Sequence, residues 1–372
     1  MNKVLPEICR IQYGYAFDSA KFSDSEGTPL IRIRDVVRGY SETYTIEECG
    51  EEYIVNDGDM LIGMDGEFNI AHWKGGKAYL NQRVCKLSPS DEVDALYLYY
   101  FMPKALKTIE DKTPFVTVKH LSAKELNKII VPLPIMEEQR RIAVSLQKVD
   151  ELIALRKEQL AKLDKLVKSR FIELFGDCKK QTNIKESGLT ISDGNYSSKY
   201  PRSEEFVERG IPFIRANNLK NGTIVDEDMY FITPQKHAIL LKGHLKPNDV
   251  LITTRGNIGQ VAIVPNKHND SNINAQIVLL RDDNNRFVPQ YLLWALQTEE
   301  AKSQYIELQT GTALKQLPVG RLEQVVIEEP PIEQQKRFAA FVEQTDKSKM
   351  AIQQSLDKLE LLKKSLMQEY FG

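Results

Sequence analysis

The chain has 372 residues, of which 42% are hydrophobic and 27% charged, and its formal net charge is −2 at pH 7. This composition predicts a folded protein of two to four domains, and a nearly neutral chain can still bind DNA if its basic residues gather on one face. No apolar run reaches the roughly 18 residues that a membrane-spanning helix needs, and the start lacks the layout of a signal peptide, so we expect a cytoplasmic protein.

Residues 1–133 are predicted to form a mixed α+β domain, and residues 134–176 a long helix. Short β-type runs bounded by turns indicate strands. In the first domain these are PLIRIRDVV (29–37), DMLIGM (59–64) and QRVCKL (82–87), and ALYLYYFMPKALKTIE (95–110) reads as a helix.

Residues 177–329 are predicted to form a second α+β domain, followed by a second long helix at 330–372. The strands expected here are PFIRANNL (212–219), DVLITT (249–254), GQVAIV (259–264) and QIVLL (276–280). PQYLLWALQTEEAKSQYIEL (289–308) reads as the helix of this domain.

The order of these elements reflects a tandem duplication. Residues 28–39 match 211–222 at an offset of 183, and the offset grows through 190 and 193 until the two helical tails align at a constant 196. Loops tolerate insertions, whereas packed interfaces do not. The drift therefore predicts two similar units with variable globular parts and length-constrained helices, related by an approximate twofold axis.

Both long helices carry the heptad seam of a coiled coil. In the first helix, steps of four and three connect Ile142, Leu146, Val149, Ile153, Arg156, Leu160, Leu163, Val167, Arg170 and Leu174. Such a seam favours antiparallel pairing of the two helices, each about 58 Å long at roughly 1.5 Å per residue. The alternative is that each helix packs on its own domain. Apolar residues beside the seam indicate that partner helices dock on the pair: Leu152, Leu155, Leu166, Phe341 and Leu362.

The sequence contains no pattern typical of an enzyme. It lacks a phosphate-binding lysine loop, HExxH, G-x-S-x-G and the tetrapeptide and glycine-rich loop of DNA methyltransferases. The five histidines show no ligand spacing, and the four cysteines are far apart, which predicts buried free thiols. We expect a non-catalytic, metal-free chain without a cofactor of its own.

Polar residues in turns are the candidates for contact with DNA. They are Arg32, Arg34, Lys74 and Lys119 in the first half, and Arg215, Asn217, Arg255, Asn257 and Lys315 in the second. Arg32 and Arg34 alternate along an expected strand and would project from one face, and arginine and asparagine are suited to guanine and adenine. An equally good interpretation is a structural ion pair of these arginines with Asp35 or Asp249.

Three motifs, each present in both halves, resemble those of the specificity subunit of type I restriction-modification enzymes. They are G-x-P-x-I-R at Gly27 and Gly210, the turns GDML and NDVLITTRGNIG, and PIMEEQRRIA or PPIEQQKRFA opening a long helix. The first half departs from the pattern, since Met64-Asp65-Gly66 stands where the second has Thr254-Arg255-Gly256.

The resemblance implies two target recognition domains separated by an antiparallel coiled coil, each domain reading one half of a bipartite double-stranded DNA site. It also implies that two methyltransferase subunits dock on the helices and methylate adenine with S-adenosylmethionine. Two restriction subunits that use ATP and Mg²⁺ would complete the assembly. The alternatives are a stand-alone bipartite DNA-binding regulator and a coiled-coil scaffold, and a steep salt dependence of binding would separate the scaffold from the two DNA-binding readings.

Overall fold

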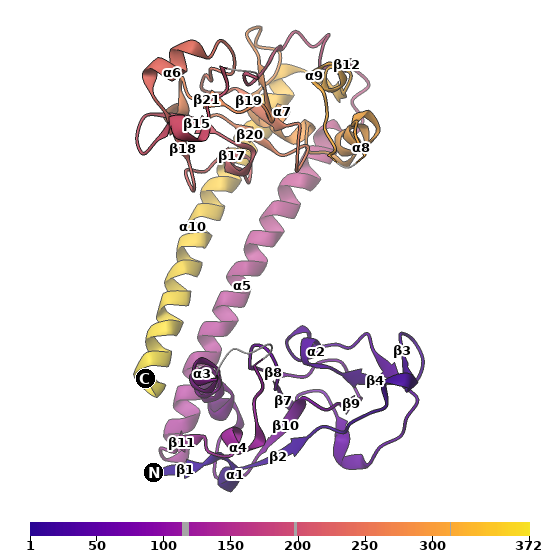
Figure 1. Ribbon diagram of the computed structural model, residues 1–372, viewed down its shortest axis with the longest axis vertical. Coiled ribbons are helices and arrows are strands. Elements are labelled where there is room, and N and C mark those ends of the chain that lie inside the picture. Colours follow the sequence, from indigo (N-terminus) through magenta and orange to yellow (C-terminus); the bar gives the residue numbers. More distant parts are fainter. Residues whose placement is uncertain (114–118, 197–198, 313) are drawn as a thin grey trace. The chain divides into compact units, whose positions relative to one another are not determined.

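The computed structural model describes residues 1–113, 119–196, 199–312 and 314–372, and the chain divides into two compact units. Unit 1 comprises Met1–Glu158 and Gln353–Gly372, and unit 2 comprises Gln159–Ile352. Each unit therefore holds one globular domain together with part of both long helices. Figure 1 shows the two domains and the helices α5 and α10.

Unit 1 contains three sheets, ordered β1-β11, β2-β10-β7-β8 and β3-β5-β4-β9-β6. All strand pairs are antiparallel except β4 with β9. The strands are β1 (Asn2–Val4), β2 (Cys9–Tyr13), β3 (Phe22–Ser23), β4 (Thr28–Ile31), β5 (Tyr44–Thr45), β6 (Ile54–Val55), β7 (Met60–Gly63), β8 (Asn69–His72), β9 (Ala78–Leu80), β10 (Val84–Pro89) and β11 (Ile130–Pro132).

Unit 2 repeats the first two sheets as β12-β23 and β13-β22-β19-β20, and its third sheet, β14-β18-β15-β21, has four strands where unit 1 has five; β16 and β17 form a further two-stranded sheet. The one parallel pair also recurs, between β15 and β21. The strands are β12 (Gln181–Asn183), β13 (Thr190–Asp193), β14 (Phe206–Val207), β15 (Ile211–Ile214), β16 (Leu219–Lys220), β17 (Thr223–Ile224), β18 (Tyr230–Ile232), β19 (Val250–Thr253), β20 (Val261–Ile263), β21 (Asn272–Ile273), β22 (Ile277–Arg281) and β23 (Val326–Glu328). The predicted α+β duplication is confirmed.

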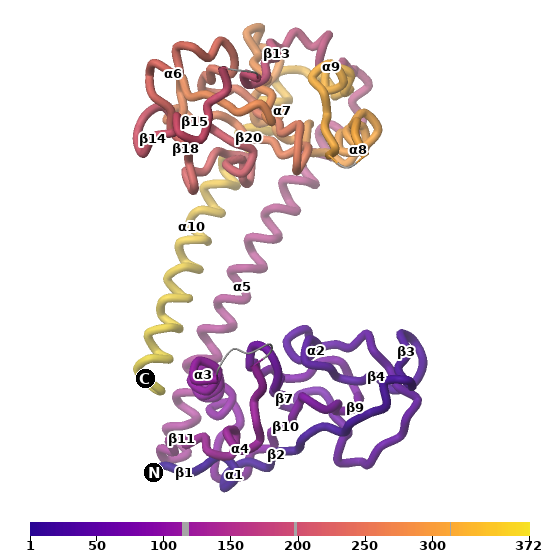
Figure 2. The backbone as a smooth tube through the Cα atoms, viewed as in Figure 1, coloured from indigo at the N-terminus to yellow at the C-terminus, as the bar shows by residue number. Residues whose placement is uncertain are grey.

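Short helices complete each domain, and the tube in Figure 2 follows the chain through them. Unit 1 has α1 (Leu5–Ile8), α2 (Ile33–Arg38), α3 (Ala95–Lys112) and α4 (Ala123–Leu126), and unit 2 has α6 (Pro234–Ile239), α7 (Pro289–Ala295), α8 (Glu299–Leu308) and α9 (Val319–Leu322). No helix of the described residues is long and apolar enough to cross a membrane.

The long helices are α5 (Met136–Phe175) and α10 (Ile332–Phe371). They run antiparallel, because Asp150 of α5 pairs with Lys363 of α10 while Arg156, further along α5, donates to Ser355, which precedes Lys363. In unit 2, Lys349 pairs with Asp164 at 2.6 Å. Polar residues of the heptad seam thus find partners on the opposite helix. The predicted antiparallel coiled coil is confirmed within each unit.

Each domain core receives the start of one long helix and the end of the other. Ile142 and Leu146 of α5 pack in the core of unit 1 together with Phe371, the last residue of α10. In unit 2 the same arrangement joins Phe338 of α10 to Phe175, the last residue of α5. Helix pairing and domain packing, posed as alternatives by the sequence, therefore occur together.

A buried glutamine fixes the start of each long helix to its domain. Gln335 donates to the carbonyl oxygens of Pro330 (2.9 Å) and Arg286 (3.1 Å), and its own oxygen accepts from the Val288 amide (2.8 Å). Gln139, 196 residues earlier, makes the corresponding bonds to Pro134, Glu92 and Asp94. Both glutamines are almost fully buried, which gives the glutamine shared by the two helix-opening motifs a physical role.

Three predicted elements are wrong in part, and one of them, the strand expected over 212–219, ends at Ile214 before a 3₁₀ turn (Ala216–Asn218). The strand expected over 29–37 ends at Ile31, because the carboxylate of Asp35 accepts from the Arg32 amide (2.9 Å) and helix α2 begins. The helix expected over 289–308 breaks into α7 and α8, where the Thr298 hydroxyl accepts from the Ala301 amide (3.1 Å) and caps α8.

The four cysteines are free thiols, but only Cys9 and Cys85 are buried, and Cys49 and Cys178 are half-buried. The expectation that all four are buried is therefore wrong for two of them. Burial raises the pKa of Cys85 to about 12 and that of Cys9 to about 11.

Candidate nucleic-acid interface

One turn forms the hub of the candidate surface in unit 2. The turn comprises residues 274–276, between β21 and β22. The Thr254 amide donates to the Gln276 carbonyl oxygen (2.8 Å), and the Asn274 amide donates to the carbonyl oxygen of Ile214 at the end of β15 (2.9 Å). Gly194 lies against it so closely that a Cβ there would stand 2.4 Å from the Asn274 oxygen. The ends of β13, β15 and β19 therefore converge on one turn.

Arg255 and Lys315 lie together beside this hub. Arg255 forms an isolated antiparallel bridge with Gln316, and the Leu317 amide donates to the Thr254 carbonyl at 2.8 Å. The Arg255 guanidinium stands over the Tyr196 ring at 5.1 Å and pairs with no carboxylate of the described residues. An arginine that is stacked but unneutralised is available to an anion. Lys315 is exposed next to it.

Unit 1 builds the same junction with different side chains. Asp65 bridges His120 as Arg255 bridges Gln316, and the Leu121 amide donates to the Met64 carbonyl at 2.7 Å. The Asp65 carboxylate contacts the His120 ring and Arg83, whose Nε lies 3.7 Å away. The first half has Asp65 where the second half has Arg255, so the basic groups at this junction of unit 1 are those of Arg83 and His120.

Arg83 is a candidate that the sequence analysis missed. It aligns with Gln276 at the offset of 193, adopts a left-handed backbone with φ 74°, and keeps 51% of its side chain exposed. A non-glycine residue at positive φ is uncommon and often marks a functional turn. The signal in the sequence was that an arginine in the first half aligns with a glutamine in the second, each near the start of an expected strand.

The arginine pair at the start of each domain is placed differently from the prediction. Arg32 is exposed at the N-cap of α2 and Arg34 lies within that helix, so the two do not alternate along one strand. Arg34 donates to the Thr43 hydroxyl (3.3 Å), and its Nε lies 3.7 Å from Asp35. The ion-pair alternative thus describes Arg34.

Arg215 and Asn217, the corresponding pair in the second half, also lie beyond the end of their strand, β15. Arg215 precedes a 3₁₀ turn (Ala216–Asn218), packs over the Tyr230 ring at 3.4 Å and donates to the Asp228 carbonyl at 2.6 Å. Its alternative partner, Asp249, is buried and pairs instead with Arg281 at 2.7 Å, which raises the pKa of Arg281. Asn217 is exposed on the turn.

The remaining candidates differ in whether their side chains already have partners within the protein. Lys119 donates to the Glu110 carbonyl at 2.8 Å and lies 3.6 Å from its carboxylate, so it closes the end of α3. Lys74 is exposed after β8 and packs beside Gly39. Asn257 is exposed in the Arg255 turn, where its carbonyl accepts from Thr253. Residues 114–118 and 313, next to Lys119 and Lys315, lie outside the described residues.

Two copies of one α+β domain, each with basic side chains beside an equivalent strand-end turn, are the arrangement expected of a DNA-recognition protein. The chain belongs to the type I restriction modification DNA specificity family, whose domain matches residues 1–165 and again 190–361. The resemblance seen in the sequence is confirmed.

Named relatives extend over nearly the whole chain. The chain is 28% identical over 405 aligned positions to the type I restriction enzyme EcoBI specificity subunit of Escherichia coli, covering 99% of this chain and 84% of that one. It is 26% identical over 348 positions to the MjaVIII specificity subunit of Methanocaldococcus jannaschii, covering 87% and 80%.

Solved structures share the fold at lower identity. The S subunit of a type I restriction-modification system from M. genitalium is 14% identical with a TM-score of 0.59, covering 100% of this chain and 96% of that one. A chain from a study of complex assembly and conformational transition of the type I R-M system is 18% identical with a TM-score of 0.62, covering 100% and 97%.

Proposed function

We propose that this chain reads a bipartite double-stranded DNA site, one half with each unit, and directs partner subunits to it. The observation that carries the proposal is the strand-end hub built twice on one chain, with Arg255 and Lys315 at one copy and Arg83 and His120 at the other. Two half-sites of different sequence require the same backbone arrangement with different side chains, as the two hubs have.

The surfaces of the long helices support a docking role. Apolar side chains beside the seam stay exposed, with Leu152 at 43%, Leu155 at 53% and Leu166 at 48%. Phe341 is the exception, since it packs against the core of unit 2. Exposed leucines on a helix pair are suited to further helices. The proposed partners are two methyltransferase subunits and, with them, two restriction subunits.

The chemistry of the assembly belongs to those partners. Adenine methylation would use S-adenosylmethionine and restriction would use ATP with Mg²⁺, each bound outside this chain. The chain itself contributes no catalytic group and would work in the cytoplasm, where chromosomal DNA is accessible.

A genome-wide map of N6-methyladenine, with the gene intact and deleted, tests the proposal. We expect one bipartite motif to lose methylation on deletion, and exchange of residues 1–133 for a relative's to change only one half of that motif. An unchanged map together with tight specific binding by the lone chain would instead favour a stand-alone regulator. Exchange that alters both halves would refute the assignment of one half-site to each unit.

The helix pair is proposed to set the spacer between the half-sites. Both helices are continuous over 40 residues. Removing one heptad from each, which preserves the seam, shortens the pair by about 10 Å, or about three base pairs at roughly 3.4 Å each. A shift of the methylated motif to a shorter spacer supports the ruler. Methylation of the original motif at the original spacer would exclude it.

A further inference from the structure

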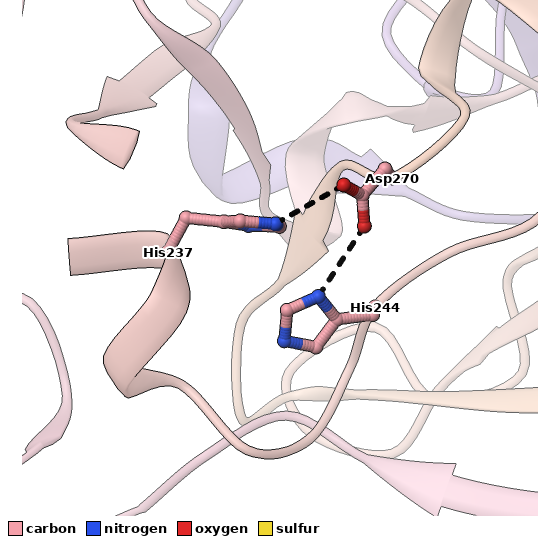
Figure 3. Close-up of side chains that lie close together, drawn as sticks. All are labelled: His237, His244 and Asp270. Carbon is pink, nitrogen blue, oxygen red and sulfur yellow. Dashed lines mark hydrogen bonds and ion pairs between the residues drawn. The ribbon is translucent and has the colours of Figure 1, made fainter. Parts of the chain in front are cut away.

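Three potential metal ligands from separate segments of unit 2 meet beside the sheet β14-β18-β15-β21. His237 lies in α6, His244 in the loop after it, and Asp270 in the loop before β21, as Figure 3 shows. His237 Nε2 lies 3.3 Å from Asp270 Oδ2, and His244 Nδ1 lies 3.4 Å from Asp270 Oδ1. One ligand atom from each residue falls within 4.8 Å of the others.

The other nitrogen of each imidazole has a partner that fixes its tautomer. His237 Nδ1 contacts the side-chain oxygen of Asn272, and His244 Nε2 lies 2.5 Å from the Leu240 carbonyl oxygen. Both oxygens only accept, so both of these nitrogens carry the hydrogen. In the neutral rings, His237 Nε2 and His244 Nδ1 therefore present lone pairs, and both point at Asp270.

Two lone pairs and a carboxylate facing one another repel unless a proton or a metal ion lies between them. We propose that His237, His244 and Asp270 bind a divalent transition-metal ion of the zinc class. Such ions take imidazole and carboxylate ligands at about 2.0–2.2 Å, which places tetrahedral ligands about 3.4 Å apart. The two nitrogen–oxygen distances are close to this value but end on different oxygens of Asp270, so the carboxylate would turn to bring one oxygen to the ion. A water molecule would supply the fourth ligand.

The surroundings match those of bound metals in general. Metal-ligating histidines usually donate their second N–H to a carbonyl or carboxylate, which orients the ring, and both histidines here do so. The two rings stand edge to face with centroids 4.4 Å apart. Asp270 adopts a left-handed backbone with φ 59°, and its amide donates to the Leu245 carbonyl at 2.8 Å. The carboxylate is thereby held against the loop that carries His244.

The ion would fasten α6 and its following loop to the edge strand β21. The same loop is already tied to β22, because Arg281 donates to the His244 carbonyl at 2.9 Å. Lys77 stands where the offset of 193 places the counterpart of Asp270 in unit 1, so the carboxylate of this site is not repeated there. The histidine spacing that predicted a metal-free chain did not show this convergence, because His237 and His244 meet Asp270 only through the fold.

Substitutions can remove the ligands while keeping the structural hydrogen bonds. His237→Asn retains a donor at the Nδ1 position toward Asn272, and His244→Gln retains one at the Nε2 position toward Leu240. Asp270→Asn removes the charge and tolerates the left-handed backbone. His72→Gln, in unit 1, is the matched control, since His72 contacts the Gly58 carbonyl through Nδ1 and packs on the Tyr99 ring, away from the three ligands.

Calorimetric titration of the full chain with ZnCl₂, in reducing buffer and a Cys49→Ser, Cys178→Ser background, tests the site. We expect one ion per chain, a higher melting temperature that a chelator reverses, and at least a 30-fold loss of affinity in each ligand variant but not in His72→Gln. If the parent chain binds no stoichiometric ion, protons alone hold the three groups and the proposal fails. If the folded variants bind as tightly as the parent, the ion lies elsewhere and the proposal is equally overturned.

Discussion

Replacing Gln335 with leucine should detach the start of α10 from its domain. The glutamine is fully buried and makes three hydrogen bonds, to Pro330, Arg286 and Val288, at 2.8–3.1 Å. Leucine fills a similar volume but leaves the Val288 amide and two carbonyls without this partner. A buried group that loses its partner costs about 1–3 kcal/mol, so we expect unit 2 to lose about 2–4 kcal/mol of unfolding free energy.

Urea unfolding followed by the fluorescence of Trp294 measures this loss in unit 2. Trp294 packs against Phe338 of α10, and a Trp73→Phe background removes the tryptophan of unit 1. The matched control is Gln334→Leu, one residue earlier and exposed, which should change stability by less than about 0.5 kcal/mol. Equal, small effects of both substitutions would refute the assignment of Gln335 as the anchor.

Three further predictions concern the helix pair, the DNA surface and a buried thiol. Lys363→Glu opposes Asp150, 2.6 Å from the lysine, and should destabilise unit 1 by about 1 kcal/mol, with a favourable coupling to Asp150→Lys in a double-mutant cycle whose single Asp150→Lys variant accounts for the lost hydrogen bond from Tyr100. Arg255→Ala should weaken DNA binding about 10-fold and flatten the log–log salt slope by about one, measured by fluorescence anisotropy. Because burial raises the pKa of Cys85 to about 12, the folded thiol keeps its proton while the unfolded thiol ionises, so the stability of unit 1 should fall above about pH 9 in a calorimetric pH series.

Each of these predictions has an outcome that contradicts it. A double variant no more stable than the sum of the two single changes predicts would show that the ion pair does not couple the helices. Arg255→Ala binding with the parent's salt slope would remove Arg255 from the phosphate contacts. Replacement of Cys85 by serine should flatten the alkaline limb of the unit 1 profile, and an unchanged limb would assign it to other groups.

Most of the fold could be predicted from two features of the sequence, the internal repeat and the heptad periodicity. Heptad spacing placed the long helices to within two residues of their ends at Met136 and Phe371, because a seam must stay in register along its whole length. The drift of the offset also separated loops from packed helices correctly. These features follow from packing rules that act locally along the chain.

The errors arose where a single hydrogen bond overrides a hydrophobic pattern. A side-chain oxygen of Asp35 accepts a backbone hydrogen bond at the start of α2, and that of Thr298 does the same at the start of α8. Residue propensities do not predict such single bonds. Among the nine proposed DNA contacts, the structure brings Arg255, Asn257 and Lys315 to one surface, and Lys119 to an internal pairing. Which of the nine touch DNA stays a prediction, since a side chain's neighbours depend on loops that no periodicity describes.

The exchange of helix ends has a consequence for synthesis of the protein. Phe371 packs on Tyr97 and Phe101 with ring centroids 5.4 and 5.8 Å away, yet it is synthesised long after both of them. Unit 2 is one continuous stretch of chain, whereas unit 1 needs residues 353–372. The first domain to leave the ribosome should therefore be the last to close its core. Its aromatic residues would stay exposed until the end of α10 has been made, and during that time chaperone binding and aggregation compete with folding.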